Sequence, residues 1–332
     1  MARQDLSGES PQRSALGAHE MERTAVVTPA GYDADEVIAA KPVGSPTRDA
    51  WRRFRRNWAA MLSLVTIVVL FVLAICAPVL HTTNPLTQHY DALNLGPGPQ
   101  HWFGTDNLGR DQYSRLLYGL RAPLLAGIVG AAITTILGTI LGVVAGYFGG
   151  LSDTLLSRFT DLVFAFPGFT LALIVVSMYG NALDAVIAGA GRLMTLIVVF
   201  AVVGWPGLMR FVRSLTLSMK AQQFIEAART CGTSHTKIIV SHLLPNMWGL
   251  ILVQAGFIVI GFVYTEATLS IFGLGVEPPN PDLGQMLYNG TSNMGVSYWE
   301  VLFPSLFLVI IFLAFTFLAD GLRDAFDPRG EG

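Results

Sequence analysis

Side chains whose types and spacing could do chemistry are sparse in this sequence, and the common catalytic patterns are incomplete. No stretch reads Gly, four residues, Gly-Lys-Ser/Thr, so we expect no ATP hydrolysis by this chain. No HExxH pair is present to hold a metal, and Cys76 and Cys231 are too few for a disulfide framework or a cysteine-rich metal site. The sequence therefore predicts a protein that is not an enzyme and binds no cofactor itself.

One polar segment, 220–245, predicts a compact interaction site. Good helix formers fill 220–229, and Gly232 is placed to end that helix in a left-handed turn. The Thr-Ser pair that follows could cap a second helix, and Pro245 stands near the end of the segment. We therefore expect a short helix, a sharp turn and a second helix.

The surface of the first of these helices predicts a docking site for another protein. Ala227 and Ala228 leave a low ridge that a partner could grip, beside an aromatic side chain at Phe224 and a charge at Glu226. A helix that inserts into a groove of its partner is a common mode of protein recognition. We interpret 220–245 as a knob that binds another protein.

The rest of the chain is too apolar for an ordinary water-soluble protein. Of its 332 residues 52% are hydrophobic and 13% are charged, whereas an average soluble domain carries about 25% charged residues. The net charge of −2 also argues against a nucleic-acid binder. Because a helix needs about 20 apolar residues to cross a bilayer, the apolar blocks predict an all-α integral membrane protein. The six predicted spans cover 59–80, 122–148, 162–179, 193–209, 247–264 and 301–318.

The basic residues predict the orientation of the spans. If the first segment is inside the cell, twelve Lys or Arg residues near the spans lie on the cytoplasmic side and four lie outside. Residues 1–56 are then a cytoplasmic tail, largely disordered with a basic end, and 57–329 form the membrane domain. Six crossings place both termini in the cytoplasm.

Two features within the spans predict how the helices pack. Gly138, Gly142 and Gly146 recur every four residues, a spacing that lets two helix backbones approach closely. This approach could serve packing within the chain or an interface between subunits. Pro167 and Pro206 lie in or near the third and fourth spans, where proline favours a kink.

Glu266 is the main ionisable residue near membrane depth. The scarcity of such residues weighs against a proton- or sodium-driven carrier. Glu266 follows the fifth span, so it could line a water-filled cavity near the outer face, pair with a neighbour to close that cavity, or simply reach water. It is our candidate for a residue of the transport pathway or its gate.

The 220–245 segment resembles the EAA loop of binding-protein-dependent ABC importer permeases. The matching residues are Glu226-Ala227-Ala228, then Gly232, and then Leu244-Pro245. His242 departs from the general pattern, which usually has Ile, but the peptide-importer branch often has His there. In that family the loop is the coupling helix that sits in a groove of the ATPase subunit. The resemblance thus implies that ATPase coupling involves Phe224, Glu226, Ala227, Ala228, Arg229, Gly232, Leu244 and Pro245.

Five further segments resemble the "C" transmembrane subunit of dipeptide and oligopeptide permeases. They are 101–119, 203–206, 266–270, 273–276 and 320–325, and the resemblance covers about 51–329. It implies a type I importer fold of six transmembrane helices with a cytoplasmic coupling-helix loop, in the bacterial cytoplasmic (inner) membrane.

The resemblance also implies partners and a function. They are a homologous second permease, two ATP-binding subunits that use ATP and Mg, an extracytoplasmic solute-binding protein and membrane lipid, with no nucleic acid. The expected cargo is a di- or oligopeptide, with glutathione or nickel chelates as alternatives. A secondary carrier without an ATPase and a non-transporting scaffold are the other classes of function left open.

Overall fold

The computed structural model describes residues 46–184 and 190–326. The described residues form helices and connecting loops, with an isolated bridge between Thr105 and Asp111. In chain order the helices are α3 Pro46–Arg56, α4 Trp58–Ile75, α5 Ala77–Leu80, α6 Gln112–Gly119, α7 Arg121–Phe148, α8 Gly150–Phe164, α9 Gly168–Asp184, α10 Gly191–Lys220, α11 Gln223–Thr230, α12 His235–Ile238, the π turn η1 Ile239–Leu243, α13 Leu244–Ile271, α14 Leu283–Ser292 and α15 Trp299–Phe326.

The predicted all-α membrane fold is confirmed. Within the described ranges, five helical stretches are long and apolar enough to cross a membrane, and the bent pair of α8 and α9 makes a sixth if it counts as one span. The five are Trp58–Ile75, Gln112–Phe148, Gly191–Lys220, His235–Ile271 and Trp299–Phe326. This matches the six helices expected of a type I importer permease.

The structure differs from the prediction at the third span, which we expected as one helix over 162–179. Helix α8 ends at Phe164 and α9 begins at Gly168, with a bend of 73° between them. Pro167 lies in the break, where it lacks a backbone N–H and disfavours helical geometry at the preceding residue. Pro206, in contrast, is accommodated inside α10.

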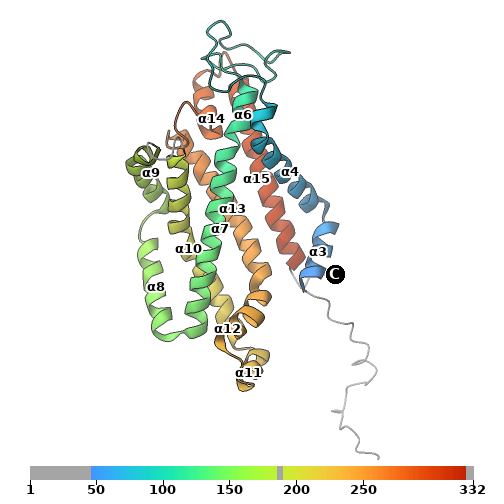
Figure 1. The fold of residues 1–332 in the computed structure, drawn as a ribbon, viewed down its shortest axis with the longest axis vertical. Helices are drawn as coiled ribbons and strands as arrows, with labels where there is room; N and C mark the ends of the chain where they lie inside the picture. The colour runs from blue at the N-terminus through green and yellow to red at the C-terminus, as the bar shows by residue number, and fades with distance from the viewer. Residues whose placement is uncertain (1–45, 185–189, 327–332) are drawn as a thin grey trace, which may run out of the picture. The chain divides into compact units, whose positions relative to one another are not determined.

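Helix α7 runs through the bundle beside α10 and α13 (Figure 1). Its glycine stripe meets α10 at short range. A Cβ atom added at Gly142 would lie 2.7 Å from the carbonyl oxygen of Met209, and one at Gly146 would lie 2.7 Å from Cβ of Thr216. Small residues at such a crossing let the backbones gain dispersion contacts in lipid. The stripe therefore serves packing within the chain, the first of its two predicted uses.

Gly142→Leu is expected to destabilise the bundle, because the clash at 2.7 Å involves a backbone oxygen and cannot be relieved by turning a side chain. Overpacking of this kind costs about 1–3 kcal/mol or more, which a lower thermal unfolding temperature in detergent would report. Gly207→Leu on α10 is the matched control, since a Cβ there meets nothing within 4 Å. Equal unfolding temperatures for the two variants would contradict the close helix crossing.

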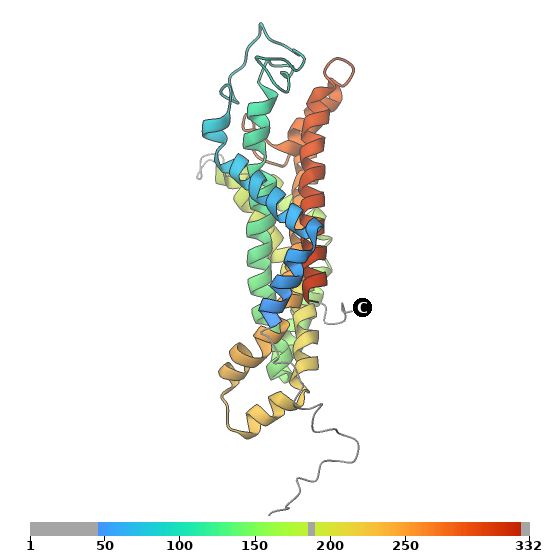
Figure 2. The same cartoon turned by 90° about the vertical axis from the view of Figure 1, so that its right-hand side faces the viewer.

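Residues 46–56, which we expected to be the basic end of a largely disordered tail, form helix α3 beside α4 and α15 (Figure 2). Ala50 and Phe54 are buried in a small apolar cluster with Ala60 of α4 and Ala325 of α15. These contacts explain why a mainly polar sequence is helical here. The disorder predicted for 1–45 concerns residues outside the described part of the chain.

Candidate functional site

The 220–245 segment forms a helical hairpin at one end of the bundle (Figure 1). Helix α11 ends at Thr230 and is followed by Gly232, whose φ is +75°. The Gly232 N–H donates to the carbonyl of Arg229 at 2.9 Å, and the Thr233 N–H donates to the carbonyl of Ala228 at 3.1 Å. These two bonds define a Schellman motif, so the chain makes the left-handed turn that the glycine predicted.

One buried side chain anchors α11 to the bundle. Ile225 is fully buried and packs in a cluster that includes Ile238, Leu243 and Met247. Sequence reasoning missed Ile225 as part of the site. The signal was its apolar character on an otherwise polar helix, which predicts that this side faces the core.

The π turn keeps the inner face of the hairpin continuous with α13. The buried residues on this face are Ile238, Leu243, Met247 and Ile251. The step across the turn, from Ile238 to Leu243, is five positions, and each later step is four positions. In an uninterrupted α-helix a step of five residues would rotate the side chain away by about 140°. A turn with i→i+5 hydrogen bonds instead holds both sides on one face.

The outer face of α11 is exposed. Phe224 is 44% exposed, and Glu226 and Ala227 are exposed beside it. Ala228 differs from the expectation of an exposed ridge, because it is half-buried against the cluster around Ile225. The low ridge is therefore formed by Ala227, with Ala228 at its inner edge.

Tyr147, near the end of α7, connects three residues of the hairpin to the bundle. Its hydroxyl lies 2.8 Å from Nδ1 of His235, and its carbonyl oxygen accepts a hydrogen bond of 2.6 Å from Nζ of Lys220. The guanidinium of Arg229 lies 5.3 Å from the centre of its ring. Sequence reasoning missed Tyr147, because these contacts join residues that are far apart along the chain.

The chain returns from the hairpin into the bundle through the remaining residues that resemble the EAA loop. Leu244 begins α13 and is half-buried, and Pro245 follows it as an exposed residue of the first turn. Proline is well suited to this position because the first N–H groups of a helix have no intrahelical partner. His242 lies in the π turn, and its carbonyl oxygen accepts a bond of 2.6 Å from Nδ2 of Asn246.

Glu266 lies near the far end of α13 and is enclosed, with 1% of its surface exposed. Its acidic neighbour is Asp282, which precedes α14. Asp282 accepts hydrogen bonds from the hydroxyl of Ser270 and from the N–H groups of Val276 and Gly284. The carboxyl of Glu266 is therefore enclosed beside Asp282 and does not reach water, while its part in the pathway or the gate stays a prediction.

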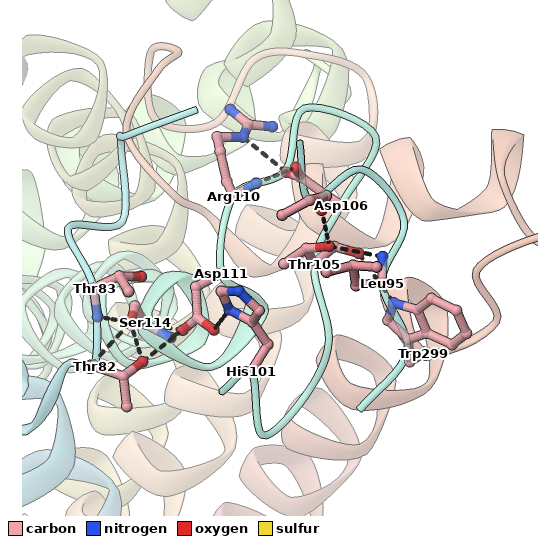
Figure 3. Close-up of polar contacts among 11 residues, drawn as sticks. Thr82, Thr83, Leu95, His101, Thr105, Asp106, Arg110, Asp111, Ser114 and Trp299 are labelled. Carbon is pink, nitrogen blue, oxygen red and sulfur yellow. Dashed lines mark hydrogen bonds and ion pairs between the residues drawn. The ribbon is translucent and has the colours of Figure 1, made fainter. Parts of the chain in front are cut away.

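The loop 81–111 and α6, at the end of the bundle opposite the hairpin, contain a buried ionic cluster (Figure 3). Nε of Arg110 donates to Oδ2 of Asp106 at 2.7 Å, and Nε of Arg115 lies 3.9 Å from the same oxygen. Arg115 also donates to the carbonyl of Pro85 at 3.2 Å. Buried charges require such pairing, so the cluster holds the loop in one shape.

Asp111 makes a second set of contacts in the same segment (Figure 3). Its carboxylate accepts hydrogen bonds from the hydroxyl of Ser114 at 2.7 Å and from the hydroxyl of Thr82 at 3.0 Å. The ring nitrogen Nδ1 of His101 lies 2.9 Å from its other oxygen. One carboxylate thus connects three parts of the segment at the start of α6.

Comparison with known proteins gives consistent matches along the chain. The model of the family described as binding-protein-dependent transport system inner membrane component matches residues 138–331. A second model, described as the N-terminal TM domain of oligopeptide transport permease C, matches residues 45–97. The glutathione transport system permease protein GsiD of Escherichia coli O6:K15:H31 is 38% identical over 304 residues, which cover 91% of this chain and 97% of the relative. Its counterpart in Shigella boydii serotype 4 is 39% identical over 297 residues, covering 89% and 95%.

Proposed function

Because the chain belongs to the family of binding-protein-dependent transport system inner membrane components, we propose that it lines one half of the pathway of an ATP-driven importer. A homologous second permease supplies the other half. Two ATP-binding subunits, which use ATP and Mg, drive the cycle, and an extracytoplasmic solute-binding protein delivers the cargo. This chain itself makes and breaks no covalent bond.

The 220–245 hairpin is the proposed contact with an ATP-binding subunit. The observation that carries this proposal is its two-sided construction, with Ile225 buried on the inside and Phe224, Glu226 and Ala227 exposed on the outside. Because Tyr147 connects the hairpin to α7, a displacement of the hairpin moves the spans with it. Closure of the ATPase pair then switches the pathway between its inward- and outward-facing forms.

The hairpin and both termini lie on the cytoplasmic side in this proposal. The excess of basic residues near the corresponding span ends supports that orientation. The ionic cluster of Asp106 and Arg110 then faces the outside, where the solute-binding protein arrives. Glu266, near the same outer end of α13, lies beside Asp282 at the start of α14, and we propose that Glu266 is part of the pathway or its gate there.

We propose a small peptide as cargo, with glutathione as the first candidate. The relatives named as glutathione transport permeases match nearly the whole chain at 38% and 39% identity. Glutathione is itself a tripeptide, so it fits the peptide class expected from the sequence. The relatives favour it over longer peptides and nickel chelates.

Cells that produce the complete importer provide the test of this function. Uptake of labelled glutathione and of a labelled dipeptide is compared with the chain present, deleted in frame and restored. We expect glutathione uptake to require both the chain and cellular ATP. Uptake by the purified chain alone in liposomes under an ion gradient would instead indicate a secondary carrier. A chain that binds an ATPase without supporting ATP-linked uptake would be a scaffold.

Two neighbouring substitutions separate docking from folding. Phe224→Ala removes an exposed ring, so we expect an unchanged unfolding temperature but about tenfold weaker association with the ATP-binding subunit, as for an interface hot spot. Ile225→Ala removes a fully buried side chain and should cost about 2–5 kcal/mol of stability. Co-purification of the ATP-binding subunit measures the first effect and thermal unfolding the second. Wild-type ATPase recovery with Phe224→Ala would contradict the docking role.

A further inference from the structure

Helix α3 presents a row of arginines away from the bundle. Its apolar side is buried through Ala50 and Phe54. The opposite side exposes four arginines, Arg48, Arg52, Arg55 and Arg56. Their spacing of i, i+4, i+7 and i+8 places them on one face of the helix. The sequence of the helix contains five arginines and one acidic residue, Asp49, so this face is strongly positive.

The position of α3 places these arginines at the surface of the bilayer. Asn57 follows α3 and caps α4 by accepting hydrogen bonds from the N–H groups of Ala59 and Ala60, so the first membrane span starts at Trp58. Trp51 is 53% exposed and Trp58 is 77% exposed. Tryptophan at the ends of spans occupies the level of the lipid headgroups. The arginines of α3 therefore lie at the depth of lipid phosphates.

An apolar groove starts at the same tryptophan and runs along the first span. It lies between α4 and α15, has a volume of about 290 Å³, and is lined by residues that include Trp58, Leu62, Ser63, Thr66, Leu313 and Phe317. The hydroxyls of Ser63 and Thr66 donate back to carbonyl oxygens of α4 at 2.8 and 2.9 Å. The groove therefore presents a hydrocarbon lining.

We propose that α3 and this groove together bind one anionic phospholipid. The guanidinium groups of α3 hold the phosphate, since arginine matches phosphate oxygens with two parallel hydrogen bonds. An acyl chain of the same molecule lies in the groove between α4 and α15. Leu62 and Leu313 at the groove are 57% and 49% exposed, so it opens among side chains that face lipid. A basic cluster beside an apolar channel fits a lipid better than a water-soluble partner protein.

The first experiment measures the lipids that co-purify with the complete importer from cells, by mass spectrometry after extraction. We expect phosphatidylglycerol or cardiolipin to be enriched over the bulk membrane. Arg52→Gln/Arg55→Gln should reduce this enrichment by about fivefold for each arginine. Arg52→Lys/Arg55→Lys keeps the charge but loses the paired N–H groups, so its enrichment should lie between those of the wild type and the glutamine variant. The matched control is Arg158→Gln/Arg210→Gln, which removes the same charge from other exposed positions outside the hairpin and should leave the enrichment unchanged.

A second variant tests the groove with the arginines intact. Thr66→Trp fills the groove from α4, so the bound anionic lipid should fall to the level of the double glutamine variant. Unchanged enrichment in Thr66→Trp would overturn the proposed acyl-chain site. If the double glutamine variant keeps its lipid but loses an ATP-binding subunit, the arginine face is a protein interface and the proposal is wrong. Equal losses of bound lipid in the Arg158 and Arg210 control would show that only the net charge of the protein matters, and would also overturn the proposal.

Discussion

A Gly232→Val variant is expected to insert into the membrane normally but to transport about tenfold less cargo than the wild type. Gly232 has a φ of +75°, a conformation that costs a residue with a side chain about 1–2 kcal/mol. A penalty near 1.4 kcal/mol corresponds to a factor of ten. A Cβ at this position meets nothing within 4 Å, so the loss comes from the backbone turn and not from a clash. Uptake per amount of membrane-inserted importer is the measurement.

Gly232→Asn is the control for this prediction. Asparagine adds a side chain at the same open position but adopts the left-handed conformation more readily than valine. We expect it to retain most of the uptake. Normal uptake by Gly232→Val would contradict the coupling role of the hairpin. Equal losses in both variants would mean that any side chain at 232 blocks docking, whatever the turn.

Asp106→Ala is expected to lower the free energy of unfolding of the outer segment by about 3–5 kcal/mol. The substitution leaves Arg110 and Arg115 without their shared carboxylate, at exposures of only 8% and 2%. It also removes the acceptor for the N–H groups of Leu108 and Arg110, each at 2.9 Å. Thermal unfolding in detergent and protease sensitivity of the 81–111 loop are the measurements.

Asp161→Ala is the matched control for the loss of an ion pair. Asp161 pairs with Arg210, and their side chains are 54% and 46% exposed. Exposed pairs contribute about 0–1 kcal/mol, so this variant should unfold close to the wild-type temperature. Equal shifts for Asp106→Ala and Asp161→Ala would show that burial does not strengthen the outer cluster.

Features with a local cause were predictable from the sequence. The spans follow from apolar blocks whose length matches the bilayer, and the turn at Gly232 follows from the conformational freedom of glycine. Pro167 indicated a kink in the third span. The size of the bend, 73°, and the start of the first half at Gly150 depend on how α8 and α9 pack against other helices, so the sequence did not predict them.

Features that depend on tertiary contacts were not predictable in the same way. Tyr147 and His235 form a hydrogen bond across 88 positions of the chain, and no spacing rule connects them. Helix α3 was interpreted as tail because its composition is mainly polar. Burial of Ala50 and Phe54 against α4 and α15 decides its structure, and that surface exists only in the folded bundle.

The π turn at Ile239–Leu243 has a consequence for changes in chain length. A π turn contains one residue more than an α turn. A homologue with one residue fewer at this position would therefore form an ordinary α turn. The apolar residues before and after the turn, Ile238 and Met247, would still share one face. The same deletion in the middle of α13 would rotate everything beyond it by about 100° relative to the hairpin. Single-residue length variation during evolution is thus tolerable at this bulge and harmful elsewhere in the helix.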